Sequence, residues 1–106
     1  MIVEERIYVL HTHVNVKEYL EIYSTEGLPA QIEILGGFLG YFTSEIGTLN
    51  QLVHLWGYSD LEDRRKRRET LAAHPGWQGC LKKIRPMIMT MENRILIPTA
   101  FSPLGN

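Results

Sequence analysis

Four side chains able to transfer protons or to contact aromatic molecules lie in segments of alternating hydrophobicity: Tyr8, Glu45, His54 and Trp56. An imidazole exchanges a proton near neutral pH, and a nearby carboxylate can share that proton. If residue 47 pairs with residue 50 in a hairpin, Glu45 lies diagonally across from His54, with roughly 7–8 Å between the two Cβ atoms. The spacing therefore indicates a candidate proton-transfer pair, with His54, Glu45 and Tyr8 as candidate catalytic residues.

A structural interpretation fits the same residues. In this interpretation Glu45 is neutralised by Arg6 in an ion pair, and His54 is a satisfied histidine. Its aromatic neighbours then pack against a second subunit. The residue types are compatible with both interpretations.

The assumed hairpin register divides the predicted sheet into two faces. In this register Tyr41 faces Trp56, and Thr43 faces His54. One face is uniformly apolar, as is typical of a sheet covered by helices, and it holds Ile7, Val9, Phe42, Val53 and Leu55. The other face mixes aromatic and polar side chains, as a cavity or an interface does. It holds Arg6, Tyr8, Tyr41, Thr43, Glu45, His54 and Trp56. We expect the helices to leave this second face open and these residues to bind a small ligand.

Hydrophobic periodicity predicts the elements that carry these faces. Strands are expected over residues 2–11, 38–46, 51–58 and 87 to about 93. A helix over 16–35 is expected to break near Gly27 and Pro29, and two further helices are expected over 60–73 and 75–84. The order β-α-β-β-α-β predicts an α+β, ferredoxin-like fold with one antiparallel four-stranded sheet. Residues 1–106 then form a single domain, with 95–106 as a C-terminal tail that can wrap a partner subunit.

The remaining reactive side chains indicate no metal site and no cofactor. His11 and His13 lie two residues apart, but a zinc site needs at least three protein ligands, and no third His or Cys is near in sequence. Cys80 lies on an apolar helical stripe and is expected to be an inert core residue. Methionines alternate along the last predicted strand, where they fit sheet packing or the wall of an adaptable apolar pocket: Met87, Met89 and Met91.

The basic run over residues 64–68 is flanked by acids at helical spacing. The expected pairs are Asp60 with Arg64, Glu62 with Lys66, Asp63 with Arg67, and Arg65 with Glu69. Because the net charge is -1, we expect no binding to nucleic acid. No apolar run approaches the roughly 20 residues of a membrane span. The acidic start and the single cysteine favour a cytoplasmic protein without a leader peptide.

Several motifs of the chain resemble those of the NIPSNAP family, and they occur in the same order. They are Ser44-Glu45-Ile46-Gly47, Val53-His54-Leu55-Trp56-Gly57-Tyr58-Ser59-Asp60-Leu61, Gly76-Trp77, Met91-Glu92-Asn93-Arg94-Ile95-Leu96-Ile97-Pro98 and Ser102-Pro103-Leu104. The matched segments run from about residue 37 to residue 104, and the first strand and helix also fit. The resemblance implies a ferredoxin-like fold whose sheets pair face to face into a dimeric α+β barrel, and hence a homodimer.

The resemblance is compatible with three functions. The first is a non-catalytic homodimer that holds a small apolar or aromatic ligand in the barrel interior. The second is an oxygenase-like or isomerase-like enzyme that uses His54 with Tyr8 or Glu45 on a small aromatic or quinone-like substrate, since the family distantly resembles small cofactor-independent monooxygenases. The third is a protein-binding adaptor, because the animal members are mitochondrial and have been linked to vesicle traffic and mitochondrial quality control. The family has no agreed set of catalytic residues.

Overall fold

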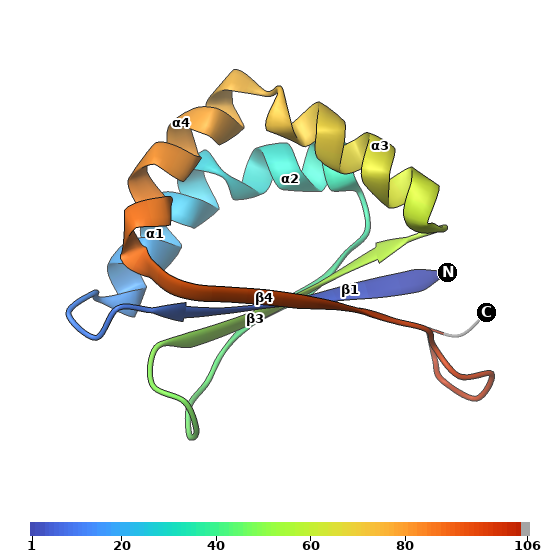
Figure 1. Cartoon of the computed structure of the whole chain (residues 1–106), viewed down its shortest axis with the longest axis horizontal. Coiled ribbons are helices and arrows are strands. Elements are labelled where there is room, and N and C mark those ends of the chain that lie inside the picture. Colours follow the sequence, from blue (N-terminus) through green and yellow to red (C-terminus); the bar gives the residue numbers. More distant parts are fainter. Residues whose placement is uncertain (105–106) are drawn as a thin grey trace.

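In the computed structural model, which describes residues 1–104, one antiparallel four-stranded sheet carries four α-helices on a single face (Figure 1). The strands are β1 (Ile2–Leu10), β2 (Phe38–Thr43), β3 (Gln51–Tyr58) and β4 (Ile88–Leu96), and they pair in the order β2-β3-β1-β4. The helices are α1 (Val16–Glu26), α2 (Leu28–Leu35), α3 (Leu61–Ala72) and α4 (Pro75–Ile84). A short 3₁₀ turn, η1 (Arg85–Met87), leads into β4. The predicted α+β, ferredoxin-like fold is confirmed.

The predicted break in the first helix is also confirmed, because Gly27 separates α1 from α2. Asn15 caps the start of α1, since its Oδ1 accepts a hydrogen bond from the backbone N–H of Lys17 at 2.9 Å. The junction at Gly27 packs closely against α4. A Cβ atom at Gly27 would lie 2.8 Å from Sγ of Cys80. A larger residue at this position would therefore push the helices apart.

The predicted hairpin register is wrong by two residues. Tyr41 pairs with His54, and Thr43 pairs with Leu52. The strand β2 ends at Thr43, and the connecting loop is longer than expected because Asn50 adopts a left-handed conformation, with φ of 58°. Its side-chain amide donates to the carbonyl oxygen of His11 at 3.0 Å, which fixes the loop against the end of β1. A shift of two residues leaves every side chain on its predicted face.

The helices cover the aromatic and polar face of the sheet, which is the reverse of our expectation. Tyr8, Leu52, His54 and Trp56 are buried beneath them, whereas Phe42 on the apolar face is 52% exposed. The reason is the area that large rings bury. An aromatic side chain buries about 150–250 Å², so covering the tyrosine and tryptophan rings is worth more than covering the smaller aliphatic side chains. A cavity between helices and sheet therefore lies inside one subunit and not between two sheets.

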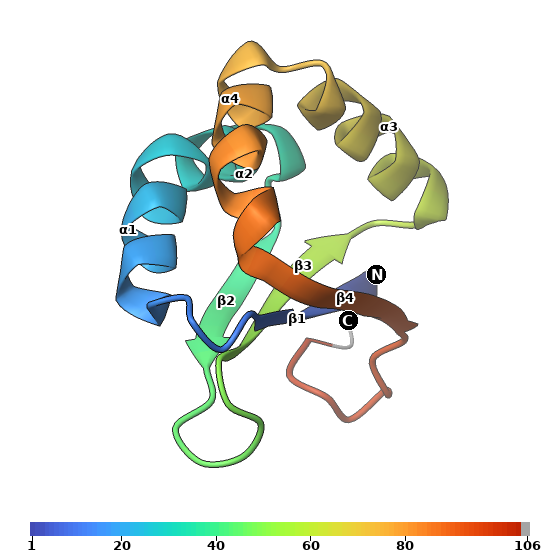
Figure 2. The ribbon, with the colours of Figure 1, turned by 60° about the vertical axis from the view of Figure 1, so that its left-hand side comes forward.

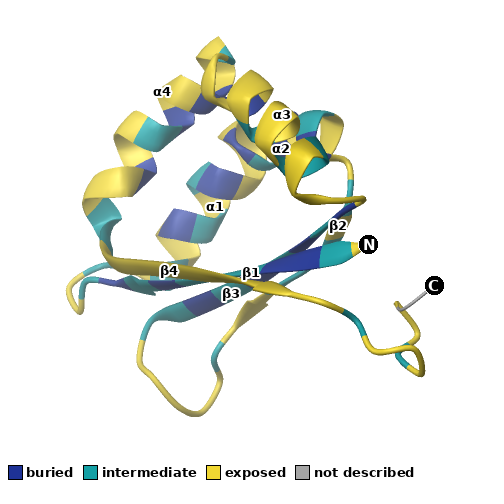
Figure 3. Cartoon of the chain, turned by 45° about the vertical axis from the view of Figure 1, so that its right-hand side comes forward, coloured by how far each residue is buried: buried dark blue, intermediate teal, exposed yellow. Residues whose placement is uncertain are grey.

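The opposite face of the sheet is not covered by any described helix. We call it the open face; its apolar side chains are Ile7, Val9, Phe42, Val53 and Leu55, and the charged Glu5, Glu92 and Arg94 lie beside them toward β4. The strand β4 continues through Leu96, so residues 95 and 96 belong to the sheet and not to the predicted tail. Residues 97–99 have no regular structure and 100–104 form turns, and Ile97 and Phe101 in this segment are 79% and 90% exposed. Figure 3 shows the exposed β4 beside the buried parts of β1 and β3. The last two tail residues, 105 and 106, lie outside the described residues.

Candidate functional site

A closed cavity of about 20 Å³ lies between the helices and the sheet. A space of this size holds about one water molecule. Side chains from all layers of the fold enclose the cavity: Tyr8, Tyr19, Tyr23, Gln31, His54, Trp77, Leu81, Ile84, Arg85, Ile88 and Met91. Only Met91 of the predicted methionine row lines it, because Met87 belongs to η1 and precedes the strand.

His54 is the central polar group of this cavity. It lies in the middle of β3, and only 1% of its surface is exposed. The indole N–H of Trp56 donates to Nδ1 of His54 at 2.8 Å, which requires the proton of a neutral imidazole to sit on Nε2. Burial lowers the pKa of His54 from its ordinary 6.5 to about 3, and the charges of Arg6 and Arg68 reinforce this effect. At neutral pH the ring is therefore a hydrogen-bond donor through Nε2.

This donor is buried without a partner. Nε2 of His54 makes no hydrogen bond to any described residue. Aromatic rings hold the imidazole on both sides. The ring of Tyr41 stacks on it at 4.4 Å between centroids, and that of Tyr8 approaches edge-on at 4.9 Å. The orientation of His54 is therefore fixed by three neighbours on the sheet.

Tyrosine hydroxyl groups provide further buried donors close to the cavity. The hydroxyls of Tyr19 and Tyr41 have no hydrogen-bond partner within residues 1–104, although each lies close enough to influence the pKa of the other. The hydroxyl of Tyr23 donates to the side-chain carbonyl of Gln31. Burial raises the pKa of all three tyrosines well above the ordinary value. They are therefore protonated at neutral pH.

The structure separates the predicted site residues into two groups. Five of them meet beneath the helices: Arg6, Tyr8, Tyr41, His54 and Trp56. Thr43 is exposed at the end of β2, and Glu45 is exposed in the β2–β3 loop. The candidate proton-transfer pair of Glu45 and His54 is therefore not formed, because the strand ends before it reaches Glu45. The predicted ion pair of Arg6 with Glu45 is also absent from the described contacts, since Arg6 bonds to Glu4 and Tyr8 instead.

A buried carboxylate that the sequence analysis missed lies beside this group. Glu4 has no exposed surface, and its Oε2 accepts hydrogen bonds from Arg6 Nη1, Arg64 Nη2 and Asn93 Nδ2 at 3.1, 2.7 and 2.7 Å. Burial alone would raise its pKa. The hydrogen bonds from Arg64 and Asn93 and the charge of Arg6 outweigh that effect and lower the pKa from 4.5 to about 2. The alternation of β1 could have revealed Glu4, because it shares the face of Arg6 and Tyr8.

The basic run on α3 is divided between the outside and the inside of the molecule. Arg65 and Arg67 pair with carboxylates on the helix surface, as predicted for Arg67 with Asp63 and for Arg65 with Glu69. Arg64 instead turns inward to Glu4, and its expected partner Asp60 caps the start of α3 by accepting from the N–H of Asp63 at 2.7 Å. The expected pairing of the basic run with its flanking acids is therefore correct for part of the run only.

A groove of about 370 Å³ leads toward the cavity from the outside. It runs between α1, the start of α2 and β2, and its lining includes Tyr23, Tyr41 and Thr43. Tyr23 also lines the closed cavity, and its ring lies 4.9 Å from that of Tyr41. These two rings therefore separate the groove from the interior.

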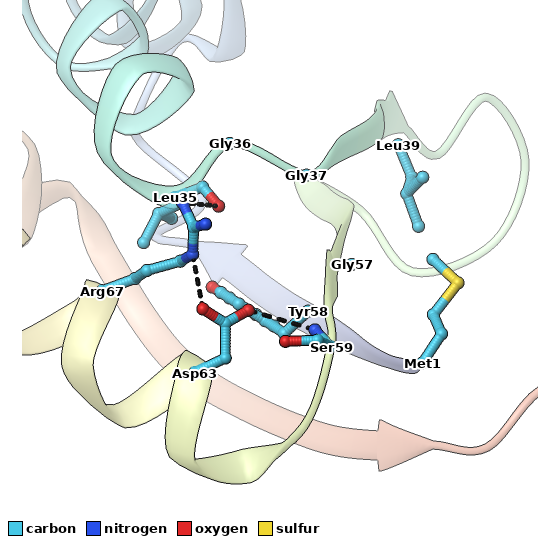
Figure 4. A pocket seen from close by; sticks show the side chains of 10 residues that line it. All are labelled: Met1, Leu35, Gly36, Gly37, Leu39, Gly57, Tyr58, Ser59, Asp63 and Arg67. Atoms are coloured by element: carbon cyan, nitrogen blue, oxygen red, sulfur yellow. Dashed lines mark hydrogen bonds and ion pairs between the residues drawn. The ribbon is translucent and has the colours of Figure 1, made fainter.

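A larger hollow of about 470 Å³ lies at the edge of the sheet beside the start of α3 (Figure 4). Its charged groups already satisfy one another. Arg67 donates to Asp63 at 2.8 Å and to the carbonyl oxygens of Ile34 and Leu35, and Asp63 accepts from the backbone N–H of Ser59. Because this hollow offers a satisfied ion pair and glycine backbone, we regard the cavity at His54 as the candidate functional site.

Two further features concern the rest of the described chain. Residues 1–104 contain no cluster of three or more histidine, cysteine, aspartate or glutamate side chains placed to hold a metal ion. His11 and His13 stack on each other at 5.5 Å between ring centroids. Within the same residues, no helix combines the length and the apolar character that crossing a membrane requires.

A single antiparallel sheet in the order β2-β3-β1-β4 with its helices on one face defines a ferredoxin-like α+β domain. The NIPSNAP family model matches residues 3–103. The chain belongs to the NIPSNAP family. It is 44% identical over 66 residues to Protein NipSnap of Drosophila melanogaster, and this match covers 62% of the chain and 24% of that protein. The chain thus spans about a quarter of the length of this relative.

Solved structures show how closely the fold is shared. The chain is similar to a NIPSNAP family protein from Agrobacterium tumefaciens, with a TM-score of 0.93, 47% identity and 97% of both chains covered. It is also similar to a NIPSNAP-like domain protein from Burkholderia xenovorans, with a TM-score of 0.92, 48% identity and coverage of 99% and 90%. SnoaB, a cofactor-independent oxygenase from Streptomyces nogalater, matches 99% of this chain and 97% of its own with a TM-score of 0.62. At 18% identity, this last similarity concerns the fold alone.

Proposed function

We propose that this protein binds a small aromatic molecule with a hydrogen-bond acceptor in the space between its helices and its sheet, and that it works as a homodimer. The observation that carries the proposal is the unpartnered Nε2–H of His54. Leaving a buried donor without an acceptor costs about 1–3 kcal/mol. An acceptor oxygen on a ligand would remove that cost, and the flanking rings of Tyr8 and Tyr41 offer flat surfaces for an aromatic body.

The ligand needs more room than the closed cavity of about 20 Å³ provides. Ligand sites usually measure about 300–1,000 Å³, and the neighbouring groove, at about 370 Å³, lies in that range. Rotation of Tyr23 or Tyr41 would join the groove to the cavity, because these two rings separate them. The ligand thus enters between α1 and β2 and reaches His54 from that side.

The open face is the surface proposed to pair with a second copy. A four-stranded sheet face of this kind offers roughly 350–400 Å², whereas a stable interface needs about 800 Å² from each partner. Additional apolar surface comes from Ile46 and Leu49 in the β2–β3 loop and from Ile97 and Phe101 in the tail, all strongly exposed. Figure 2 shows this loop and the tail projecting from the side of the sheet opposite the helices. A second copy at the open face would bury these side chains together with it.

Titration calorimetry with 1-naphthol tests the binding proposal, with cyclohexanol as the non-aromatic control. We expect 1-naphthol to bind and the His54→Phe variant to bind it at least tenfold more weakly, because phenylalanine keeps a ring but offers no N–H. His13→Phe, on an exposed loop, is the matched control and should bind like the wild type. Equal affinity in the His54→Phe variant, or no binding to the wild type, would contradict the proposal.

A second candidate function is oxygenation of a hydroquinone-like substrate that itself supplies the electrons to O₂. It is favoured by the shared fold with SnoaB, described as a cofactor-independent oxygenase. In such a reaction the Nε2–H of His54 would stabilise the substrate oxyanion. His54 would not be the base, because Trp56 occupies its other nitrogen. An oxygen electrode with 1,4-dihydroxynaphthalene tests this, and uptake no faster than in the His54→Phe variant would exclude it.

A further inference from the structure

Three arginine side chains gather beneath α3, next to the candidate site. Arg64 and Arg68 lie one helical turn apart on α3, which lies above the sheet in Figure 1. Arg64 and Arg6 both bond to Glu4 of β1, so their side chains meet between α3 and the sheet. Arg6 is the direct partner of His54 across the β1–β3 ladder, and its Nε donates to the hydroxyl of Tyr8 at 3.0 Å. The arginine cluster, defined as Arg6, Arg64 and Arg68, is therefore continuous with the proposed ligand site.

One carboxylate serves this cluster. Glu4 bonds to Arg6 and Arg64 through Oε2, while its Oε1 stays without a partner. Arg68 is not among the arginines that this carboxylate binds. Its positive charge instead shifts the pKa values of two neighbouring groups, Tyr58 and His54. Burial raises the pKa of Tyr58 and Arg68 opposes that rise, and Arg68 also disfavours the charged form of His54.

Donors of the cluster are buried but unused. Nε of Arg64 and Nη1 of Arg68 are shielded from solvent and have no hydrogen-bond partner in the part of the chain that the structure describes. The hydroxyl of Tyr58 also forms no hydrogen bond of regular geometry, although it lies close enough to Arg68 for that charge to lower its pKa. A buried charge is normally paired, because an unpaired one is strongly disfavoured. Apart from Oε1 of Glu4, which is also unpartnered, the described chain offers these donors no acceptor, and they are available to one on a ligand.

The outward-facing arginines of the same helix provide the comparison. Arg65 and Arg67 are far more exposed than the cluster, and yet each has a carboxylate partner at 2.7–2.8 Å. Exposed pairs contribute little to stability. The helix thus pairs its outward arginines with carboxylates, whereas the half-buried Arg68 has no carboxylate partner among the described residues. If Arg68 had only a structural role, we would expect it to have a carboxylate partner and the outward arginines to be left to water.

We infer that the ligand of this site is an organic anion whose carboxylate or phosphate group binds between Arg64 and Arg68, with its aromatic body against Tyr8 and His54. This inference rests on the proposed function and adds the charge of the ligand to it. Oxyanions accept hydrogen bonds from two guanidinium groups at once, and such charge-assisted bonds are the strong ones. Since both acids share this chemistry, the experiment must distinguish a carboxylate from a phosphate.

Titration calorimetry with benzoate, phenyl phosphate and the neutral benzyl alcohol tests the inference. We expect one of the two anions to bind the wild type at least tenfold more tightly than benzyl alcohol, and the stronger anion to identify the class. Arg68→Gln should abolish this preference, and Arg68→Lys should keep part of it. Lys66→Gln removes the same charge from the exposed side of α3 and should keep the full preference.

Thermal melting of the ligand-free variants separates a binding role from a structural one. Because Arg68 has no carboxylate partner among the described residues, Arg68→Gln should leave the melting temperature unchanged or raise it. A lower melting temperature than that of Lys66→Gln, or a retained anion preference in Arg68→Gln, would overturn the inference. If anions bind no better than benzyl alcohol while 1-naphthol still binds through His54, the inference fails and the proposed function stands. If no aromatic compound binds, both fail.

Discussion

His54 owes its chemical character to a residue two positions along the same strand. The indole N–H of Trp56 occupies Nδ1 of the imidazole, and a neutral imidazole with an acceptor at Nδ1 must carry its proton on Nε2. Burial disfavours a second proton, and so do Arg6 and Arg68. The residue is therefore suited to donate a hydrogen bond and poorly suited to act as a base. This property argues against the proton-transfer role that the sequence suggested for His54.

The pKa of His54 leads to a prediction about stability. The ring takes up a proton at about pH 6.5 in the unfolded chain and at about pH 3 in the folded one. The unfolded state therefore binds more protons as the pH falls below 6.5, and the free energy of unfolding decreases from there toward pH 3 by up to about 1.4 kcal/mol per pH unit. Urea unfolding of the wild type at a series of pH values should show this decrease between pH 6.5 and 4.5.

The variant His54→Gln should flatten the pH dependence in that interval, because the titrating group is gone. Below about pH 4.5 a decrease should remain in the variant, since Glu4 has its pKa lowered to about 2 and its contribution is lost on protonation. His13→Gln should leave the profile of the wild type unchanged. An identical profile in His54→Gln would mean that another group causes the acid sensitivity.

At the residue scale, strand alternation alone predicted much of the site. It placed Arg6, Tyr8 and His54 on one face of the sheet, and the structure confirms that placement. It failed for Glu45 because the end of β2 depends on the loop conformation at Asn50, which side-chain alternation does not encode. It also missed the contact of Glu4 with Arg64, since a salt bridge between residues 60 positions apart leaves no local pattern.

At the scale of the elements, the entry into β2 depends on a close approach between two glycines. The backbone N–H of Gly57 donates to the carbonyl oxygen of Gly37 at 2.7 Å. A Cβ atom at Gly37 would lie 2.1 Å from the carbonyl oxygen of Gly57, and a backbone atom cannot move aside easily. This contact ties the segment after α2 to the end of β3, and so it fixes how the helices meet the sheet.

We therefore predict that Gly37→Ala lowers the free energy of unfolding by about 2–3 kcal/mol, as overpacking and backbone displacement usually do. Gly79→Ala is the control, because a Cβ atom at Gly79 in α4 meets no atom of the described chain within 4 Å. In a helix interior this change should raise stability by about 1 kcal/mol. Urea unfolding measures both values. A Gly37→Ala variant as stable as the wild type would show that this contact is easily relaxed.

The elements themselves were largely predictable, but the choice of covered face was not. The break at Gly27 and the order of strands and helices follow from local signals, and the structure confirms them. Which face the helices cover depends on the sum of buried area and on partners from the helices, such as Arg64 for Glu4. Polarity judged strand by strand therefore predicted that the helices cover the other face. This was wrong because the area buried by the rings of Tyr8 and Trp56 outweighs the polarity of their neighbours.

At the scale of the whole molecule, the reversal of the faces changes what a dimer would cover. The uncovered side of the sheet is more apolar than our expectation assumed, since it carries Ile7, Val53 and Leu55 in place of His54 and Trp56. These apolar side chains adjoin one another on β1, β2 and β3 and are bordered by the charged Glu5, Glu92 and Arg94, and an apolar patch with a polar rim is typical of an interaction surface. The ligand site and the dimer surface then lie on opposite sides of one sheet, so that each can be altered without removing the other.

Because the ligand site and the dimer surface lie on opposite sides of the sheet, a change on the open face can test the dimer alone. Val53 lies at the centre of that face, between Ile7 of β1 and Phe42 of β2. We expect sedimentation equilibrium at micromolar concentration to give the mass of a dimer for the wild type and of a monomer for Val53→Glu, because two carboxylates facing each other in an apolar interface are strongly disfavoured. In a single subunit the new carboxylate would face water, so the variant should fold and should keep part of its affinity for 1-naphthol. Lys66→Glu, on the exposed side of α3, should remain a dimer. A wild-type monomer, or a dimer that persists in Val53→Glu, would show that this face is not where two copies meet.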